Sequence, residues 1–240
     1  MTPDPARALR RGLRDSAPFL VIILPFSLLF GVAARDAGLD VLQVVAMSVT
    51  VIAGASQFTA LSLMVDQAPV FVVVLASLAV NLRMAMYSAA LVPHLGAAPL
   101  GTRALLSWVM VDQIFALTQA TYEREPAMPM AEKVAYYLGN VLTIIPVWFS
   151  CTLLGALIGQ AIPPALSADF AVPVCFIALI APMLRSLPHV AAAGVSVAGA
   201  LVFAWVPWNM GLLCAAALAM AAGAQTEFAL ARRAARQGAA

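Results

Sequence analysis

The sequence VIAGASQFTALSL, residues 51–63, lies inside a long apolar run and carries Gly, Ser, Gln and Thr at its centre. The whole run, residues 41–65, exceeds the length of about 20 residues that an α-helix needs to cross the hydrocarbon core of a bilayer. Lipid offers these polar groups no hydrogen-bond partner, so they must be buried in protein or line a wet cavity. The stretch therefore predicts a membrane-spanning segment whose polar centre packs against other helices or binds something.

The rest of the chain has the same character. Of its 240 residues, 63% are hydrophobic and 10% are charged, and the mean hydropathy is +0.96. A soluble domain carries about 25% charged residues, so the bilayer is the predicted solvent. We expect an all-α integral membrane protein with about eight transmembrane helices, at residues 17–34, 41–65, 69–92, 104–121, 134–158, 170–184, 190–206 and 208–227.

Basic residues gather at the two ends of the chain and in alternate connections. Cytoplasmic loops carry an excess of Lys and Arg, and eight spans put both termini on the same side. With both termini cytoplasmic, most basic residues outside the spans lie on that side, which predicts a basic cytoplasmic N-terminus (1–16), one transmembrane domain (17–227) and a basic cytoplasmic C-terminus (228–240). The first apolar run contains Pro25 and is longer than an ordinary signal core, so we interpret it as a retained helix.

The Gly54-Ala55-Ser56-Gln57 stretch admits two interpretations. One is a discontinuous second helix whose later half begins near Ser56 and turns free N–H groups and the positive end of its dipole toward a substrate carboxylate. The other is a face of small residues at which a neighbouring helix approaches closely.

Two charged residues lie well inside predicted spans. Arg83, accompanied by Asn81 and Tyr87, is in 69–92, and Asp112 is in 104–121. A charge at that depth normally faces the bundle interior and has a partner. Asp112 therefore either pairs with Arg83 in a structural role, or holds a substrate ammonium or a proton.

Catalytic and metal-binding patterns are absent from the sequence. It has no HExxH, GxSxG or Walker motif. Cys151, Cys175 and Cys214 lie in apolar runs without CxxC spacing, and His94 and His189 stand alone. We expect no enzyme activity, no cofactor and no metal site.

Four motifs together resemble a known family. PFSLLFGVAARDAGL (25–39), GASQFTALSLM (54–64), VNLRMAMYSAALVPHL (80–95) and VDQIFALT (111–118), in this order and spacing, resemble the large subunit of AzlC-type branched-chain amino acid permeases. The resemblance implies export of leucine, isoleucine, valine and methionine across the inner membrane, together with a small AzlD-type membrane subunit. Relatives often have His and Glu where this chain has Met84 and Gln113. If those residues carry protons in the relatives, proton coupling in this chain either differs from theirs or rests on Asp112 alone.

A branched-chain amino acid presents a carboxylate, an ammonium and a compact apolar side chain. We expect N–H groups near the GASQ stretch, with Arg83 or Asn81, to bind the carboxylate, and Asp112 to bind the ammonium or the driving proton. Phe58, Phe115 or nearby aliphatic residues would shape the side-chain pocket. The predicted substrate-binding residues are Gly54, Ser56, Gln57, Phe58, Asn81, Arg83 and Asp112. The alternatives are an exporter of another small zwitterion and a membrane scaffold subunit that transports nothing.

Overall fold

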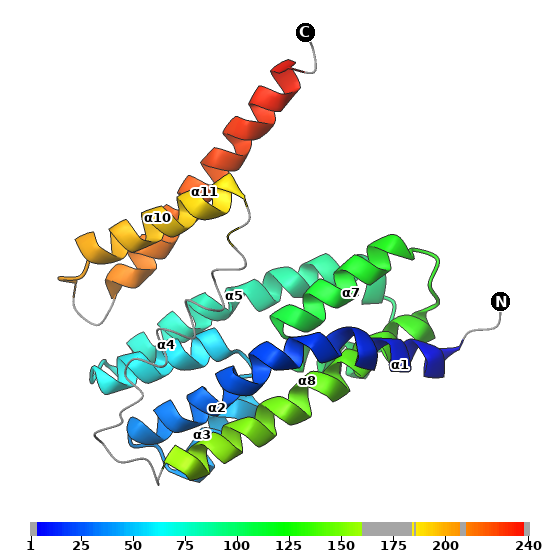
Figure 1. Ribbon diagram of the computed structural model, residues 1–240, viewed down its shortest axis with the longest axis horizontal. Coiled ribbons are helices and arrows are strands. Elements are labelled where there is room, and N and C mark those ends of the chain that lie inside the picture. The colour runs from blue at the N-terminus through cyan, green and yellow to red at the C-terminus, as the bar shows by residue number, and fades with distance from the viewer. Residues whose placement is uncertain (1–3, 160–183, 185, 207–209, 238–240) are drawn as a thin grey trace. The chain divides into compact units, whose positions relative to one another are not determined.

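A computed structural model describes residues 4–159, 184, 186–206 and 210–237, and every regular element in this part of the chain is helical (Figure 1). The predicted span 170–184 lies almost entirely outside the described residues. The chain divides into two compact units, one formed by Met1–Ser62 and Val74–Ala171, the other by Leu63–Val73 and Val172–Ala240. The helices are α1 (Pro5–Ser16), the short 3₁₀ turn η1 (Ala17–Phe19), α2 (Leu20–Asp36), α3 (Val41–Thr50), α4 (Gly54–Val65), α5 (Val70–Leu95), α6 (Leu100–Trp108), α7 (Asp112–Arg124), α8 (Met130–Gly159), α10 (Leu187–Val202) and α11 (Met210–Gln237).

The frame of the first unit is a pair of long helical segments. α1, η1 and α2 form one stretch, Pro5–Asp36, that packs along α8 (Figure 1). A Cβ on Gly12 would overlap the carbonyl oxygen of Tyr136, and one on Gly31 would overlap that of Thr152. Both crossings occur in the same chain order, so the two segments run parallel, in backbone contact of the kind that small residues permit.

The predicted second span is broken. α3 ends at Thr50, residues 51–53 are not helical, and α4 begins at Gly54. The capping box of α3, formed by Asp40 and Gln43, sets the start of the segment. The predicted break therefore exists, although the second half begins two residues before Ser56.

The predicted fourth span, 104–121, is broken as well, and the sequence did not lead us to expect this. α6 ends at Trp108, and α7 begins at Asp112 after the extended Val111. Valine is a weak helix former because its branched Cβ crowds the preceding turn, and an acidic residue suits the first turn of a helix. Both features favour a helix start at this point.

The second unit contains a helical hairpin. Gly199 of α10 packs on Ala215 of α11, and Gly223 of α11 packs on Ala192 of α10. The order of these two contacts makes α10 and α11 antiparallel. The predicted spans 190–206 and 208–227 correspond to these two helices.

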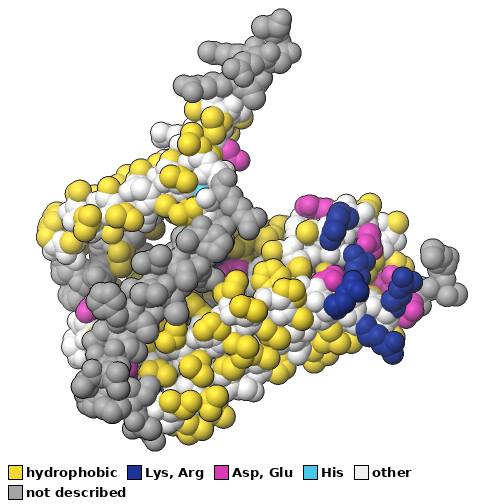
Figure 2. Space-filling model, viewed as in Figure 1, with side chains coloured by type: hydrophobic (Ala, Val, Ile, Leu, Met, Phe, Trp, Pro, Cys, Tyr) yellow, Lys and Arg dark blue, Asp and Glu magenta, His cyan; other side chains and the backbone are white. Residues whose placement is uncertain are grey.

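Large apolar side chains cover much of the surface, as a lipid solvent requires. Val21, Leu42 and Val70 are 77%, 77% and 78% exposed. Figure 2 shows hydrophobic side chains along the sides of the first unit and Lys and Arg gathered at one end of it. Within the described residues, four helical segments are long and apolar enough to cross a membrane: Pro5–Asp36, Val70–Leu95, Met130–Gly159 and Cys214–Arg232. The count of eight spans and the side on which the termini lie stay predictions.

Candidate functional site

A hydrogen bond joins the two broken segments beside their breaks. Trp108, the last residue of α6, donates from its indole Nε1 to the carbonyl oxygen of Val49 near the end of α3, over 3.2 Å. The last carbonyls of a helix have no partner inside it, and this bond satisfies one of them. The ends of two separate broken segments thus meet beside residues 51–53 and 109–111.

α5 runs past both breaks. The hydroxyl of Ser56 in α4 donates to the carbonyl oxygen of Ser77 in α5 over 2.7 Å. α4 and α5 are consecutive helices joined by a short turn, so they run antiparallel. One turn further along α5, Asn81 is therefore level with the first break. Asn81 is half-buried, and its Oδ1 has no hydrogen-bond partner among the described residues.

Arg83 and Asp112 form an ion pair at the second break. The guanidinium Nη1 of Arg83 lies 2.9 Å from Oδ2 of Asp112, and the two side chains are 29% and 40% exposed. Arg83 Nε and Asp112 Oδ1 are buried and have no partner within the described part of the chain. These two atoms are therefore unpaired although they are buried, while other parts of the two side chains are exposed.

Asp112 also occupies the first position of α7. The preceding residue, Val111, is extended and provides no side-chain cap. The first amides of a helix have no intrahelical partner and carry the positive end of its dipole. The carboxylate of Asp112 is thus stabilised both by Arg83 and by its own helix. One turn away, Tyr87 stacks on Phe115 with ring centroids 4.1 Å apart, which gives the pair an aromatic wall.

Gln57 lies in a separate network on the other side of the first break. Its Nε2 donates to the hydroxyl of Ser48 over 3.4 Å, and Trp148 Nε1 donates to the same hydroxyl over 3.1 Å. Ser48 in turn donates to Thr152 over 3.4 Å. Gln57 is fully buried, yet its Oε1 has no partner among the described residues. Gln57 is therefore tied to α3 and α8, whereas Arg83 and Asp112 are tied to each other.

Gly54 and Phe58 line the side of α4 that faces α2. A Cβ on Gly54 would overlap the ring of Phe26 and lie 2.9 Å from Trp148. Phe58 packs edge-on against Phe26 and Phe30, with centroid separations of 5.3 and 5.5 Å. Both features that the sequence left open are present at Gly54, because the helix breaks there and a small residue also permits close packing.

The sequence did not point to several residues that support the site. Trp108 and Ser48 join the broken segments to their neighbours, and the hydroxyl of Tyr137 donates to the Leu106 carbonyl at the end of α6 over 2.7 Å. Indole and phenol groups at membrane depth need hydrogen-bond partners. That need marks them as candidates, but only the fold shows which carbonyls they satisfy.

Comparison with known proteins places this arrangement in a family. The AzlC protein family model matches residues 18–162, which is more than half of the chain and contains both breaks, Gln57 and the Arg83–Asp112 pair. The chain belongs to the AzlC family. This is a membrane permease-type family, which is consistent with a transporter-related role.

Two curated relatives are similar over most of their length. An uncharacterized membrane protein of Archaeoglobus fulgidus is 28% identical over 218 residues, covering 88% of this chain and 91% of the relative. The inner membrane protein YgaZ of Escherichia coli K12 is 26% identical over 188 residues, covering 75% of this chain and 76% of the relative. No solved structure matches the chain. Like these two relatives, this AzlC-family chain is a membrane protein.

Proposed function

We propose that this AzlC-family protein is a secondary transporter that exports branched-chain amino acids through a site at the paired helix breaks. The observation that carries the proposal is the Arg83–Asp112 ion pair at the start of α7. It joins one cation and one anion at the N-terminus of α7, inside segments predicted to cross the membrane. Discontinuous helices in transporters commonly form substrate sites in this way.

A zwitterionic amino acid matches the pair charge for charge. Its carboxylate would bind Arg83 and the free amides at the start of α4 or α7, and its ammonium would bind Asp112. A buried charge is expensive without a partner, so a ligand that separates the pair must supply both replacement charges at once. A simple cation could replace only the partner of Asp112, and a simple anion only the partner of Arg83, so the other residue would be left without a counter-charge.

The surroundings suit a compact apolar side chain. The stacked rings of Tyr87 and Phe115 lie next to the ion pair. Aromatic and aliphatic walls favour leucine, isoleucine, valine and methionine by burial of apolar area, at about 25 cal/mol per Å². In this scheme Ser56 and Asn81 line the first break and help to hold the carboxylate, while Gly54, Gln57 and Phe58 hold α4 in place.

We further propose that transport is coupled to protons and that a second subunit takes part. Asp112 is the acidic side chain at the breaks, so its protonation would release Arg83 and exchange with ammonium binding. We also propose that a small AzlD-type membrane subunit assembles with this chain in the cell inner membrane. Helices of the first unit leave large apolar side chains exposed, such as Leu82 and Met86 at 64% and 65%, and a bilayer and a membrane partner would cover them together.

Export of leucine from cells preloaded with a leucine-containing dipeptide tests the proposal. We expect Asp112→Asn and Arg83→Gln each to reduce the efflux rate at least tenfold at equal expression. Arg103→Gln, which removes an exposed arginine of α6, is the matched control and should export normally. Unchanged export in both site variants would remove the ion pair from the mechanism. Normal intracellular leucine in a strain that lacks the gene and its partner would instead favour the scaffold function.

A further inference from the structure

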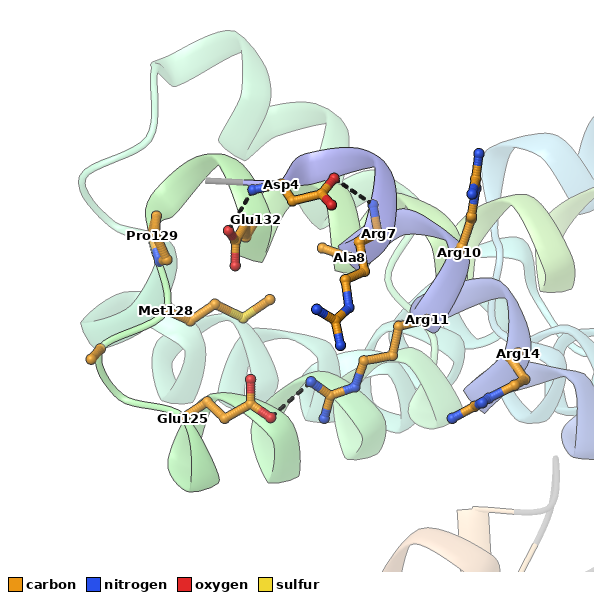
Figure 3. A pocket seen from close by; sticks show the side chains of 11 residues that line it. Asp4, Arg7, Ala8, Arg10, Arg11, Arg14, Glu125, Met128, Pro129 and Glu132 are labelled. Atoms are coloured by element: carbon orange, nitrogen blue, oxygen red, sulfur yellow. Dashed lines mark hydrogen bonds and ion pairs between the residues drawn. The ribbon is translucent and has the colours of Figure 1, made fainter. Parts of the chain in front are cut away.

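A second polar feature lies at the opposite end of α7 from the second helix break. It is a groove of about 1040 Å³ between α1 and the loop that joins α7 to α8 (Figure 3). The groove is lined by Asp4, Arg7, Ala8, Arg10, Arg11, Arg14, Glu125, Ala127, Met128, Pro129 and Glu132. Figure 3 shows the guanidinium of Arg7 between Met128 and Arg11. Nothing in the proposed transport site uses these residues.

Helix lengths place the groove in the headgroup region of a bilayer. The segments Pro5–Asp36 and Met130–Gly159 contain 32 and 30 residues. At about 1.5 Å per residue they extend about 48 and 45 Å, whereas the hydrocarbon core is about 30 Å thick. The excess falls at the polar end, because α1 carries four arginines and α2 carries the apolar run. The groove therefore lies where lipid phosphates are found.

The carboxylates that line the groove are already engaged. Glu125 binds Arg11 over 2.7 Å, and Glu132 accepts from the backbone N–H of Asp4 over 2.7 Å. Asp4 caps α1 by accepting from the N–H of Arg7 over 3.0 Å. These interactions fix the walls of the groove, and because the three carboxylates keep their charges, the lining carries four guanidiniums against three carboxylates.

Three of the arginines make a weak ion pair or none within the described residues. Arg7 and Arg10 are exposed and make no ion pair with any described residue. Arg14 is 85% exposed and reaches Asp15 at only 3.8 Å. A guanidinium has five N–H donors in a planar fork that fits the oxygens of a phosphate. Arg7, Arg10 and Arg14, at i, i+3 and i+7, share one face of α1.

We propose that this groove binds the headgroup of an anionic phospholipid. Arg7 and Arg14 hold the phosphate, and Arg10 adds positive charge at the rim. The groove has an apolar floor formed by Ala8, Met128 and Pro129. This floor can contact the glycerol and the first acyl carbons of a lipid, whereas inorganic phosphate has no apolar part to contact it. Through Arg11–Glu125 and Asp4–Glu132, the bound lipid would also stabilise the docking of α1 on α8.

Titration of the full-length protein in a neutral detergent tests this proposal. The probes are dihexanoyl-phosphatidylglycerol, dihexanoyl-phosphatidylcholine and inorganic phosphate, and the readouts are the dissociation constant and the shift in Tm. We expect dihexanoyl-phosphatidylglycerol to bind saturably and to raise the Tm. Dihexanoyl-phosphatidylcholine should bind at least tenfold more weakly. Raising the salt concentration should weaken the binding, because exposed charges are screened beyond about 10 Å at 0.1 M.

Variants locate the site. A basic residue near an anionic surface contributes roughly a fivefold factor to binding, so R7Q/R10Q/R14Q should lose on the order of 100-fold in affinity. R232Q/R233Q/R236Q removes the same charge from the other end of the chain and should bind as the wild type does. R7K/R10K/R14K keeps the positive charge of α1 that sets the membrane orientation. Its affinity for the lipid should fall only severalfold, because lysine is charged but lacks the planar fork of donors. Equal binding of both lipids by the wild type, or a Tm rise with inorganic phosphate alone, would overturn the proposal.

Discussion

The pairing of Arg83 with Asp112 predicts a strong energetic coupling between the two residues. With 2.9 Å between Nη1 and Oδ2, the charge centres are about 4 Å apart, and their interaction is about 4 kcal/mol at an effective dielectric constant of 20. The side chains are 29% and 40% exposed, so solvent screening reduces the expected coupling to about 2 kcal/mol. Arg83→Gln and Asp112→Asn should each destabilise the protein by about 2 kcal/mol, since each leaves one charge without its partner.

The assay is a double-mutant cycle on the purified protein, with the free energy of unfolding measured in mixed micelles of increasing denaturing detergent. The double variant R83Q/D112N should be about 2 kcal/mol more stable than the sum of the single effects implies. A second cycle with Arg103 and Asp112 is the control, and it should be additive because Arg103 has no ion pair with any described residue. A coupling below about 0.3 kcal/mol in the first cycle would refute a direct ion pair.

Three further predictions concern packing and the polar networks. Gly31→Val should destabilise the first unit by about 1–3 kcal/mol in unfolding assays, because the new side chain overlaps the α8 backbone; Gly194→Val, where an added Cβ would meet no atom within 4 Å, should change stability by less than about 0.5 kcal/mol. Tyr137→Phe should lower stability by about 1–2 kcal/mol by leaving a carbonyl of α6 without its donor, and an unchanged unfolding midpoint would contradict this. Gln57→Leu should alter stability by less than about 1 kcal/mol, because its one hydrogen bond is long at 3.4 Å; a large loss of leucine efflux in this variant would show that its unpaired oxygen serves transport.

Apolar length was enough to predict most of the helical segments. Residues 69–92 and 134–158 were expected to be spans. α5 begins one residue later and ends three residues later than predicted, and α8 begins four residues earlier and ends one residue later. The rule works because a helix satisfies its own backbone in lipid. It says little about how a segment continues outside the hydrocarbon core, and for this reason it missed α1, whose arginines lie on one face of a helix packed on α8.

The two breaks differ in how visible they are in the sequence. At Gly54 a weak helix former and a buried amide stand in the middle of an apolar run, and these features made a break one of the two open interpretations. At residues 109–111 the chain has only valines and a methionine before Asp112. β-branched residues are tolerated in membrane helices, so these valines favour a break but do not by themselves predict one. The second break depends on tertiary contacts, namely the Trp108 and Tyr137 hydrogen bonds to the carbonyls at the ends of α3 and α6.

Among the predicted site residues too, some contacts could be predicted from the sequence and others could not. Arg83 and Asp112 are the charged residues deep in predicted spans, and elementary electrostatics made each the natural partner of the other. Gln57 had no such constraint, because an amide can bond to many neutral groups. Its attachment to Ser48, away from the ion pair, follows from the packing of α3 and α8 around it and has no signature in the sequence.

In the proposed transport site, the charges at the paired breaks would determine what kind of ligand fits. α4 and α7 are the second halves of segments separated by one intervening span, so both run in the same direction and present N-termini of about +0.5 charge each at one level. The ends of α3 and α6 contribute about −0.5 each, partly neutralised by Trp108 and Tyr137. The opposite charges of Arg83 and Asp112 cancel. The site is therefore nearly neutral but strongly divided into positive and negative parts, and a net-neutral ligand with separated charges is matched to it. A dicarboxylic or a dibasic amino acid would add an uncompensated charge at membrane depth, so export of glutamate or lysine should be weak even where the side chain fits.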